Sequence, residues 1–300
     1  MALSDNLRGV IFMNIAMAAF TVNDALMKLA TESVPLMQAI TMRGGLTASA
    51  LIVLALATGA LRFQVPRRDA GLLVLRTLAE VAATLTFLIA LVHLPLANIS
   101  AILQSLPLAV TLASALILGD RVGWRRLSAI VVGFVGVLLI VRPGTAGFNE
   151  WSVLALISVA FVVVRDLSTR RFSASLPSVT VALSAAVAVA VTGLAGMQVQ
   201  GGWQPMAAAD ALLICGAATA LVFGYMLIVK AMRTGEVAVV APFRYVALLW
   251  AILLGWVLFA TLPDALTWCG AALIVASGLF TLWREARLRR DAAARAGTGA

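Results

Sequence analysis

Charged residues are scarce in this sequence of 300 residues. They make up 12% of it, whereas hydrophobic residues make up 62%, and a typical soluble domain has roughly 25% charged residues. This deficit excludes an ordinary soluble protein of one or two domains. Histidine occurs once, which excludes a zinc site built from a cluster of ligands. We expect no metal site and no cofactor.

Cysteine is also rare, and the motifs of common enzymes are missing. Cys215 and Cys269 lie in separate apolar stretches, so each is expected to be a small core residue, and nothing indicates a bond between them. The sequence has no Walker A motif and neither an H-E-x-x-H nor a G-x-S-x-G motif. We therefore expect neither an ATP-driven pump nor an enzyme, and we assign no catalytic residue.

Apolar stretches follow one another along the whole chain. A helix needs about 20 apolar residues to cross the hydrocarbon core of a bilayer, and short connections rich in proline or glycine separate the stretches. The sequence therefore predicts an all-α polytopic membrane protein with ten transmembrane helices. The predicted helices are residues 7–30, 35–58, 70–92, 97–118, 124–141, 150–171, 175–196, 208–231, 236–260 and 265–284.

Positive charges fall mainly on one side of this arrangement. With the N-terminus inside, 17 of the 22 Lys and Arg lie in inside segments, Lys28 and Arg142 lie outside, and Arg43, Arg76 and Arg244 lie within spans. Cytoplasmic loops carry such an excess, so we expect a multi-pass protein of the inner (plasma) membrane with both termini in the cytoplasm. Because the arginines form short clusters between apolar segments, the expected partner is the lipid bilayer and not a nucleic acid.

The two halves of the sequence resemble each other. Each contains a long span with a proline, a short polar break and a closing helix with small residues. Five helices per half invert the second half relative to the first, as in many secondary transporters. We expect one five-helix repeat in residues 1–145, a second, inverted one in 146–284 and a basic cytoplasmic tail in 285–300.

Two segments carry a resemblance to a known family. They are LPLANISAILQSLPLAVTLASALILGDRVGWRRLSAIVVGFVGVLLIVRPG (94–144) and VVAPFRYVALLWAILLGW (239–256). The chain resembles the EamA-type carriers of the drug/metabolite transporter superfamily, and is most similar to the amino-acid exporters of the YddG type. The resemblance implies two inverted repeats of five helices around a central cavity, and transport of small metabolites.

The chain departs from the family pattern at two helix ends. The family often has a glutamate where the fourth and ninth helices end, whereas this sequence has Asp120 and Thr261 there. If those glutamates couple transport to protons, this chain lacks half of the coupling. Proton-coupled and facilitated transport both stay open.

Charged residues inside spans are the first candidates for a substrate site or gate, because they are costly there and are functional or paired. On a helical wheel, Arg244 shares the face of smaller residues such as Ala251 and Gly255. Its guanidinium suits a carboxylate, which leaves three interpretations: a substrate carboxylate, a gating ion pair, or a fixed pair with Glu80 or Asp24.

Two acidic residues complete the charged candidates. Glu80 follows Arg76 by four residues, which favours an ion pair within one helix, although at mid-depth it could also bind a substrate amine or a proton. Asp24, beside Asn23, could serve the substrate or pair with Lys28 one turn on.

Polar and aromatic side chains supply the remaining candidates. Ser100 and Gln104 share one face of the fourth helix, and Gln104 lies one turn before Pro107. Pro107 and Pro242 are expected to break their helices, because each removes a backbone hydrogen bond. The candidate apolar walls of the cavity are Phe223, Phe243 and Tyr245.

Together these features predict a secondary transporter that works by alternating access around a central cavity. We expect it to export amino acids, aromatic or other neutral ones among them, and related small metabolites. The alternatives are a carrier for S-adenosylmethionine or riboflavin and, from another class, a channel or structural membrane protein. A channel prefers a continuous polar stripe or charge rings, which the sequence lacks. We expect a monomer whose partners are a small-molecule substrate and the bilayer.

Overall fold

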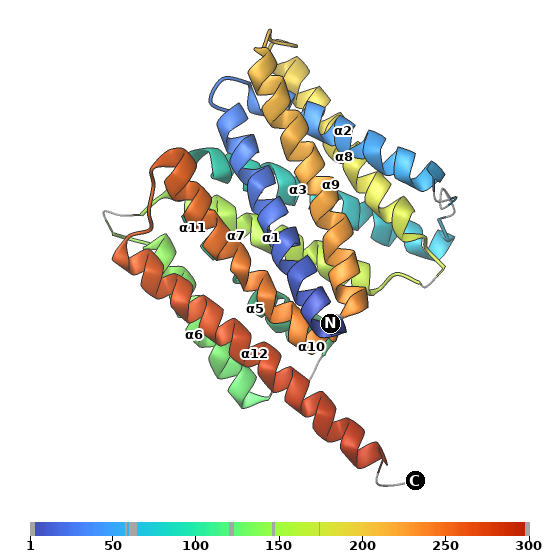
Figure 1. Ribbon diagram of the computed structural model, residues 1–300, viewed down its shortest axis with the longest axis vertical. Helices are drawn as coiled ribbons and strands as arrows, with labels where there is room; N and C mark the ends of the chain where they lie inside the picture. Colours follow the sequence, from blue (N-terminus) through green and yellow to red (C-terminus); the bar gives the residue numbers. More distant parts are fainter. Residues whose placement is uncertain are drawn as a thin grey trace.

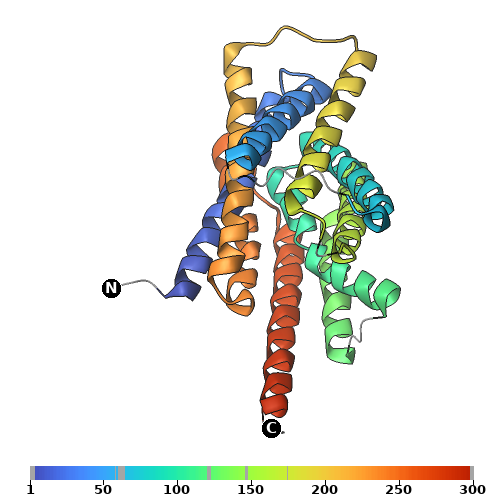
Figure 2. The same cartoon turned by 90° about the vertical axis from the view of Figure 1, so that its right-hand side faces the viewer.

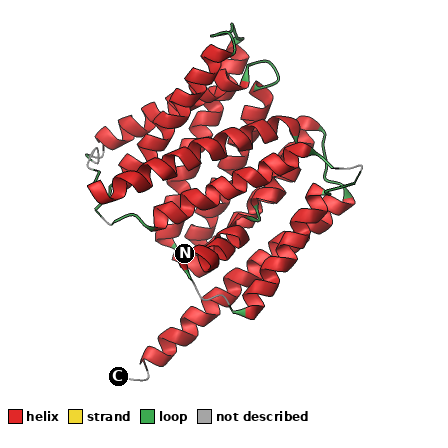
Figure 3. Ribbon diagram, turned by 180° about the vertical axis from the view of Figure 1, so that it is seen from behind, coloured by secondary structure: helices red, strands yellow, loops and turns green. Residues whose placement is uncertain are grey.

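A computed structural model describes residues 4–57, 59, 65–119, 123–145, 148–173 and 175–297 of the protein. These residues form a helical bundle without a strand (Figure 3). The helices in chain order are α1 (Asp5–Ala30), α2 (Leu36–Ala57), α3 (Arg67–His93), α4 (Leu96–Leu103), α5 (Leu106–Ala113), η1 (Ser114–Leu118), α6 (Trp124–Val141), α7 (Glu150–Arg170), α8 (Ser178–Val199), α9 (Ala208–Thr234), α10 (Val237–Val240), η2 (Ala241–Tyr245), α11 (Val246–Phe259) and α12 (Ala265–Gly297).

Ten membrane spans emerge from these helices within the described residues, as the sequence predicted. The short elements α4, α5 and η1 join into the fourth span, and η2 and α11 join into the ninth. The fifth span, 124–141, and the tenth, 265–284, have the predicted bounds. Large apolar side chains face outward, such as Leu116 (77% exposed) and Leu212 (72% exposed), as a lipid environment requires.

Prolines and short polar side chains set where several helices begin. Four helices, α2, α3, α4 and α8, have a proline immediately before their first residue, namely Pro35, Pro66, Pro95 and Pro177. The Ser4 side chain accepts a hydrogen bond from the Leu7 N–H (3.3 Å) at the start of α1. Asn149 accepts one from the Trp151 N–H (2.9 Å) at the start of α7. Each cap satisfies an N–H that the helix leaves unpaired.

The set of helix pairs stays the same when the two repeats are exchanged for each other (Figure 1). The most extensive contacts join α1 with α9, α3 with α7, α6 with α12 and α2 with α8, and α4 packs on α11. Counted as spans, these pairs are first with eighth, third with sixth, fifth with tenth, second with seventh and fourth with ninth. Replacing each span by its counterpart five places away returns the same set of pairs. The fold is therefore two five-helix repeats, and the odd number inverts the second.

The closing helices α6 and α12 approach each other through glycine. A Cβ atom on Gly136 would lie 2.6 Å from the Gly270 carbonyl oxygen, and one on Gly270 would lie 2.5 Å from the Gly136 carbonyl oxygen. No larger residue fits at either position without moving a backbone. This close approach is what the small residues of the two closing helices predicted.

The structure corrects the expected position of the two cysteines. Cys215 and Cys269 are free, but they are exposed and not core residues as expected. Residues in these helices are apolar on every face, so the sequence pattern does not separate a core position from a lipid-facing one.

At the C-terminus, α12 continues past Arg284 to Gly297 and projects beyond the other helices (Figure 2).

Candidate functional site

Both proline-containing spans are interrupted in the structure. The fourth span leaves its helix at Gln104 and resumes at Leu106, with Pro107 in the first turn of α5. In the ninth span, α10 gives way to the tighter 3-10 turn η2, whose first turn holds Pro242. A proline has no N–H to donate and fits the first turn of a helix better than its interior. Each proline therefore coincides with a change of helix geometry.

The two breaks touch each other through Gln104. Its side-chain Nε2 donates to the backbone carbonyl oxygens of Arg244 (3.3 Å) and Tyr245 (3.2 Å). Its backbone N–H donates to the carbonyl oxygen of Ser100 (3.1 Å), one turn earlier. Gln104 thus links the broken span of the first repeat to the broken span of the second.

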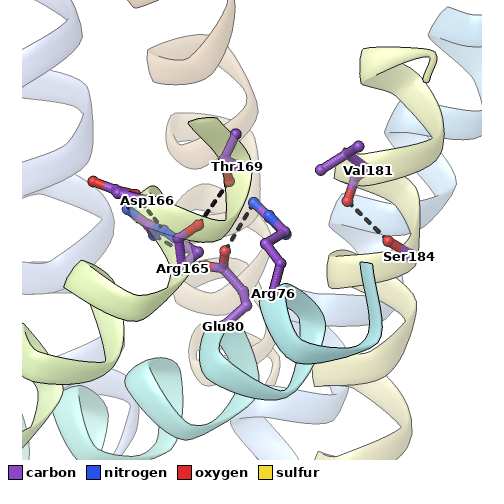
Figure 4. A network of polar contacts seen from close by, with 7 residues as sticks. All are labelled: Arg76, Glu80, Arg165, Asp166, Thr169, Val181 and Ser184. Atoms are coloured by element: carbon purple, nitrogen blue, oxygen red, sulfur yellow. Dashed lines mark hydrogen bonds and ion pairs between the residues drawn. The ribbon is translucent and has the colours of Figure 1, made fainter. Parts of the chain in front are cut away.

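A cluster of four charged side chains joins α3 to α7 (Figure 4). We call Arg76, Glu80, Arg165 and Asp166 the charge cluster. Glu80 pairs with Arg76 on its own helix (3.1 Å) and with Arg165 on α7 (3.4 Å). Arg165 also pairs with its neighbour Asp166 (2.9 Å). The Arg76–Glu80 pair expected from the spacing is present, and the second partner of Glu80 connects the first repeat to the second.

Arg244 lies beside this cluster without joining it. Its side chain is exposed and makes no hydrogen bond or ion pair with any described residue. Asp166 and Arg165 lie within electrostatic range of its guanidinium. Neither Glu80 nor Asp24 pairs with it, so the fixed structural pair considered from the sequence is not formed. Arg244 and the charge cluster together hold three arginines against two carboxylates, a surplus of one positive charge.

A second polar group lies between α1 and α2. Arg43 Nη1 donates to Asn23 Oδ1 (3.4 Å), and Asn23 Nδ2 donates to Asp24 Oδ1 (2.9 Å). Arg43 is 7% exposed, and its Nε has no hydrogen-bond partner. The expected alternative, an Asp24–Lys28 pair, is not formed among the described contacts. Lys28 instead donates to three carbonyl oxygens at the end of α3, those of Leu91, Val92 and Leu94.

Tyr225 of α9 lies near charged residues of both polar groups. Glu80, Arg76 and Arg43 are all within electrostatic range of its hydroxyl. Its ring packs edge-on against Phe20, with 5.2 Å between ring centroids. Phe223 precedes Tyr225 by two residues and so points about 200° away around the helix, which separates it from this group.

The other candidates from the sequence contact neighbouring side chains or backbone and are not part of the charge cluster. Phe243 packs against the apolar group of Met13 and Met17. Tyr245 is 6% exposed, and a Cβ atom on Gly278 of α12 would overlap its hydroxyl. Thr261 donates its hydroxyl to the Gly255 carbonyl oxygen (3.1 Å). Asp120 lies outside the described residues.

Sequence reasoning did not assign Arg165 and Asp166 to the group around Arg244. Arg165 was counted with the cytoplasmic charges that report topology. The signal that could have found it is the adjacent pair Arg165–Asp166, which follows a long apolar run within α7. Charged residues within a membrane span are candidates for a functional site.

Comparisons with known proteins agree with this architecture. The model of the EamA-like transporter family matches residues 7–142 and again residues 149–283. A pseudopaline exporter of Pseudomonas aeruginosa is 25% identical over 277 residues, covering 89% of this chain and 93% of that protein. A solved crystal structure superposes with a TM-score of 0.64 at 20% identity, covering 93% of this chain and 98% of the other.

Two further relatives match a shorter part of the chain. A riboflavin transporter of Vibrio cholerae is 30% identical over 194 residues. An S-adenosylmethionine uptake transporter of Rickettsia felis is 27% identical over 195 residues. Each alignment covers 64% of this chain and 64% of the relative. The named relatives transport different small molecules, and their names include both an exporter and an uptake carrier.

Proposed function

The chain belongs to the EamA-like transporter family, and from that premise we propose that it is a secondary carrier that exports amino acids. The proposal includes the inner membrane as its location, cytoplasmic termini and a monomeric carrier. It also includes the division into repeats at residues 1–145 and 146–284, with a cytoplasmic tail in 285–300. The carrier works by alternating access, in which the two repeats rock around a central substrate site.

One observation carries the substrate class: Arg244 has no acidic partner among the described residues, although the paired charges of Asp166 and Arg165 lie within electrostatic range. A guanidinium without a counter-ion in a membrane span is costly, and its planar fork matches a carboxylate. A substrate carboxylate supplies the missing charge. An amino group on the same substrate finds acceptors in Asp166 and Glu80 of the charge cluster. An amino acid carries both of these charged groups.

The charge cluster also offers a way to couple binding to movement. Glu80 and Arg165 connect α3 of the first repeat to α7 of the second. A zwitterion beside Arg244 competes for both members of that pair, because its amine attracts Glu80 and its carboxylate attracts Arg165. Binding then loosens the link between repeats, and Gln104 passes the movement between the two broken spans.

The other substrate classes make different demands on Arg244. S-adenosylmethionine has an amino-acid head group, so it needs the same arginine. Riboflavin has no carboxylate, so its transport does not need a guanidinium at this position. The dependence of transport on Arg244 therefore separates riboflavin from the two substrates with an amino-acid group.

The test is counterflow into proteoliposomes that contain the purified protein. Vesicles are loaded with one unlabelled compound and supplied with labelled amino acids, S-adenosylmethionine or riboflavin, with and without a pH gradient. We expect saturable amino-acid counterflow. Acceleration by a pH gradient adds proton coupling, whereas the absence of amino-acid counterflow overturns the proposal. Unsaturable flux identifies a channel instead.

The matched variants are Arg244→Ala, Arg244→Lys and Arg68→Ala. Arg68 is an exposed arginine in the first turn of α3, so its variant removes the same charge elsewhere. We expect Arg244→Ala to lower amino-acid counterflow by about tenfold or more, because a hydrogen bond to a charged group contributes about 1.5–3 kcal/mol. Arg244→Lys should recover part of it, and Arg68→Ala should transport normally. Normal amino-acid transport by Arg244→Ala would remove this arginine from the substrate site.

A further inference from the structure

A pocket of about 440 Å³ lies between the first turn of α6 and the end of the tenth span in α12. Trp124 is the first residue of the fifth span, and Arg284 is the last residue of the tenth. The pocket therefore lies at the membrane boundary. None of the residues that line it belongs to the group around Arg244, so the transport function leaves it unexplained.

Among the residues that the structure describes, three arginines and no acidic residue line this pocket. They are Arg125 of α6 and Arg284 and Arg287 of α12. None of the three forms an ion pair with a described residue. Arg125 lies over the Trp124 ring (5.3 Å to the centroid), and Arg287 lies over the Trp283 ring (5.6 Å). These ring contacts hold two of the positive charges in place but do not neutralise them.

An anion with phosphate geometry fits this set of donors. Arginine binds phosphate oxygens through two parallel N–H groups. The Ser128 hydroxyl also lines the pocket, and α6 begins at Gly123, which offers no side-chain cap to the first N–H groups. Such N–H groups add donors for an anion, although the three arginines supply the main attraction.

The surroundings of the pocket suit a lipid better than a soluble anion. Two tryptophans at a membrane boundary occupy the depth of lipid head groups. Below the arginines, Leu127 and Val131 of α6 are 48% and 56% exposed, and Phe280 of α12 is 39% exposed. A molecule seated here thus meets cations at one end and an exposed apolar surface along its length.

We propose that this pocket binds the phosphate head group of an anionic phospholipid from the surrounding leaflet, with the acyl chains along α6 and α12. Basic pockets between transmembrane helices are suited to such head groups. The bound lipid contacts both closing helices, one from each repeat, at the boundary of the membrane.

The experiment measures lipid binding to the delipidated protein in detergent by native mass spectrometry and by the shift of the melting temperature. Phosphatidylglycerol is compared with phosphatidylcholine of the same acyl chains and with soluble glycerol phosphate. We expect phosphatidylglycerol to bind most tightly and to raise the melting temperature. The variant Arg125→Ala/Arg287→Ala should weaken its binding by about 30-fold, since each arginine adds attraction to an anionic lipid.

The control variant is Arg67→Ala/Arg68→Ala in α3, which is an odd-numbered span like that of α6 and so starts at the same membrane boundary. It should bind phosphatidylglycerol normally. Arg125→Lys/Arg287→Lys keeps the charge without the guanidinium and should bind with intermediate affinity, which preserves the test if the alanine variant does not fold. Equal weakening by both alanine variants, equal binding of the two lipids, or an equal effect of glycerol phosphate would each overturn the proposal.

Discussion

The helix pairs α3–α7 and α1–α9 are counterparts under exchange of the repeats, yet different chemistry joins them. An ion pair from Glu80 to Arg165 joins α3 to α7, and Glu80 also pairs with Arg76 on its own helix. In α1–α9, the Phe20 ring packs against Gly224 and Tyr225. Arg165 and Phe20 even hold the same position, each fifteen residues after the first residue of its helix, Glu150 and Asp5. The helix arrangement is repeated, whereas the charged side chain at this position, Arg165, is replaced by an aromatic one, Phe20.

This difference indicates which of the two helix interfaces, α3–α7 or α1–α9, a charged substrate can separate. A charged substrate can compete for the partners of an ion pair, and competition is strong where water is scarce. An apolar contact between a ring and a glycine offers such a substrate nothing to replace. The transport proposal therefore assigns the movable contact to α3–α7 and the fixed contact to α1–α9.

The largest expected effect comes from Glu80→Gln, which removes the carboxylate and keeps the side-chain shape. Arg76 loses its acid, and two of its nitrogens already lack a hydrogen-bond partner. We expect the free energy of unfolding to fall by about 3 kcal/mol, the lower end for breaking a buried pair, because Glu80 and Arg76 are 15% and 14% exposed. The melting temperature in detergent measures the stability, and counterflow measures the accompanying loss of transport.

The control for Glu80→Gln is Glu32→Gln, which removes the same charge from an exposed site in the connection after α1. It should leave both readouts unchanged. If Glu80→Gln melts and transports like the wild type, the α3–α7 ion pairs have no role in stability or gating, and the comparison between the two helix pairs loses its meaning.

The second test breaks the apolar counterpart through Gly224→Ala. The added Cβ atom would lie 2.8 Å from Phe20 Cε1, so the ring or the helix must shift. We expect a loss of about 1–2 kcal/mol from overpacking, measured by the melting temperature, with recovery in the double variant Gly224→Ala/Phe20→Leu. Gly71→Ala in α3 is the matched control, since a Cβ atom there meets nothing within 4 Å and alanine favours a helix over glycine. A stability loss in Gly71→Ala as large as in Gly224→Ala would contradict the close packing.

The architecture could be predicted from the sequence because the bilayer imposes it. A span needs a fixed length of apolar residues, and the loop charges report its direction. The two exceptions to the expected charge pattern, Lys28 and Arg142, have structural reasons. Lys28 closes the end of α3 by hydrogen bonds to its carbonyl oxygens, and Arg142 pairs with Asp264 beside the start of α12.

The site could be predicted only in part, because its contacts join residues far apart in the chain. Spacing within one helix gave the Arg76–Glu80 pair. It could not give Arg165 as the partner of Glu80 85 residues away, or the carbonyl of Arg244 as the partner of Gln104 140 residues away. The helical wheel for Arg244 also assumed one continuous α-helix, whereas Ala241–Tyr245 is a 3-10 turn with a different angle per residue.

A third, smaller effect concerns the joint that connects the broken spans. Gln104→Leu keeps the approximate size and removes the donor to the carbonyl oxygens of Arg244 and Tyr245. We expect a loss of about 1 kcal/mol in the free energy of unfolding, together with slower counterflow. Gln198→Leu changes an exposed glutamine near the end of α8 and should change neither. Unchanged counterflow in Gln104→Leu would show that the two broken spans move independently of this bond.

The smallest expected effect separates an exposed ion pair from the partly buried pairs of the charge cluster. Asp264 lies outside the membrane spans, immediately before α12, and its side chain is 55% exposed. A hydrogen bond from Arg142, followed by one from the Thr267 N–H, holds the pKa of its carboxyl below the ordinary range. A lowered pKa stabilises the fold at every pH above the ordinary value, near 3.9, and this contribution is lost as the pH falls below it.

Asp264→Asn isolates the charge, because asparagine keeps the acceptor for the Thr267 N–H (2.9 Å) and caps a helix as well as aspartate does. At pH 7 we expect a loss of no more than about 0.5 kcal/mol, the usual contribution of an exposed pair. The difference in melting temperature between the variant and the wild type should be constant above about pH 4 and shrink as the pH falls below this value. A loss at pH 7 as large as that of Glu80→Gln would mean that exposure does not weaken an ion pair in this protein. The contrast between the charge cluster and the rest of the bundle would then need another cause.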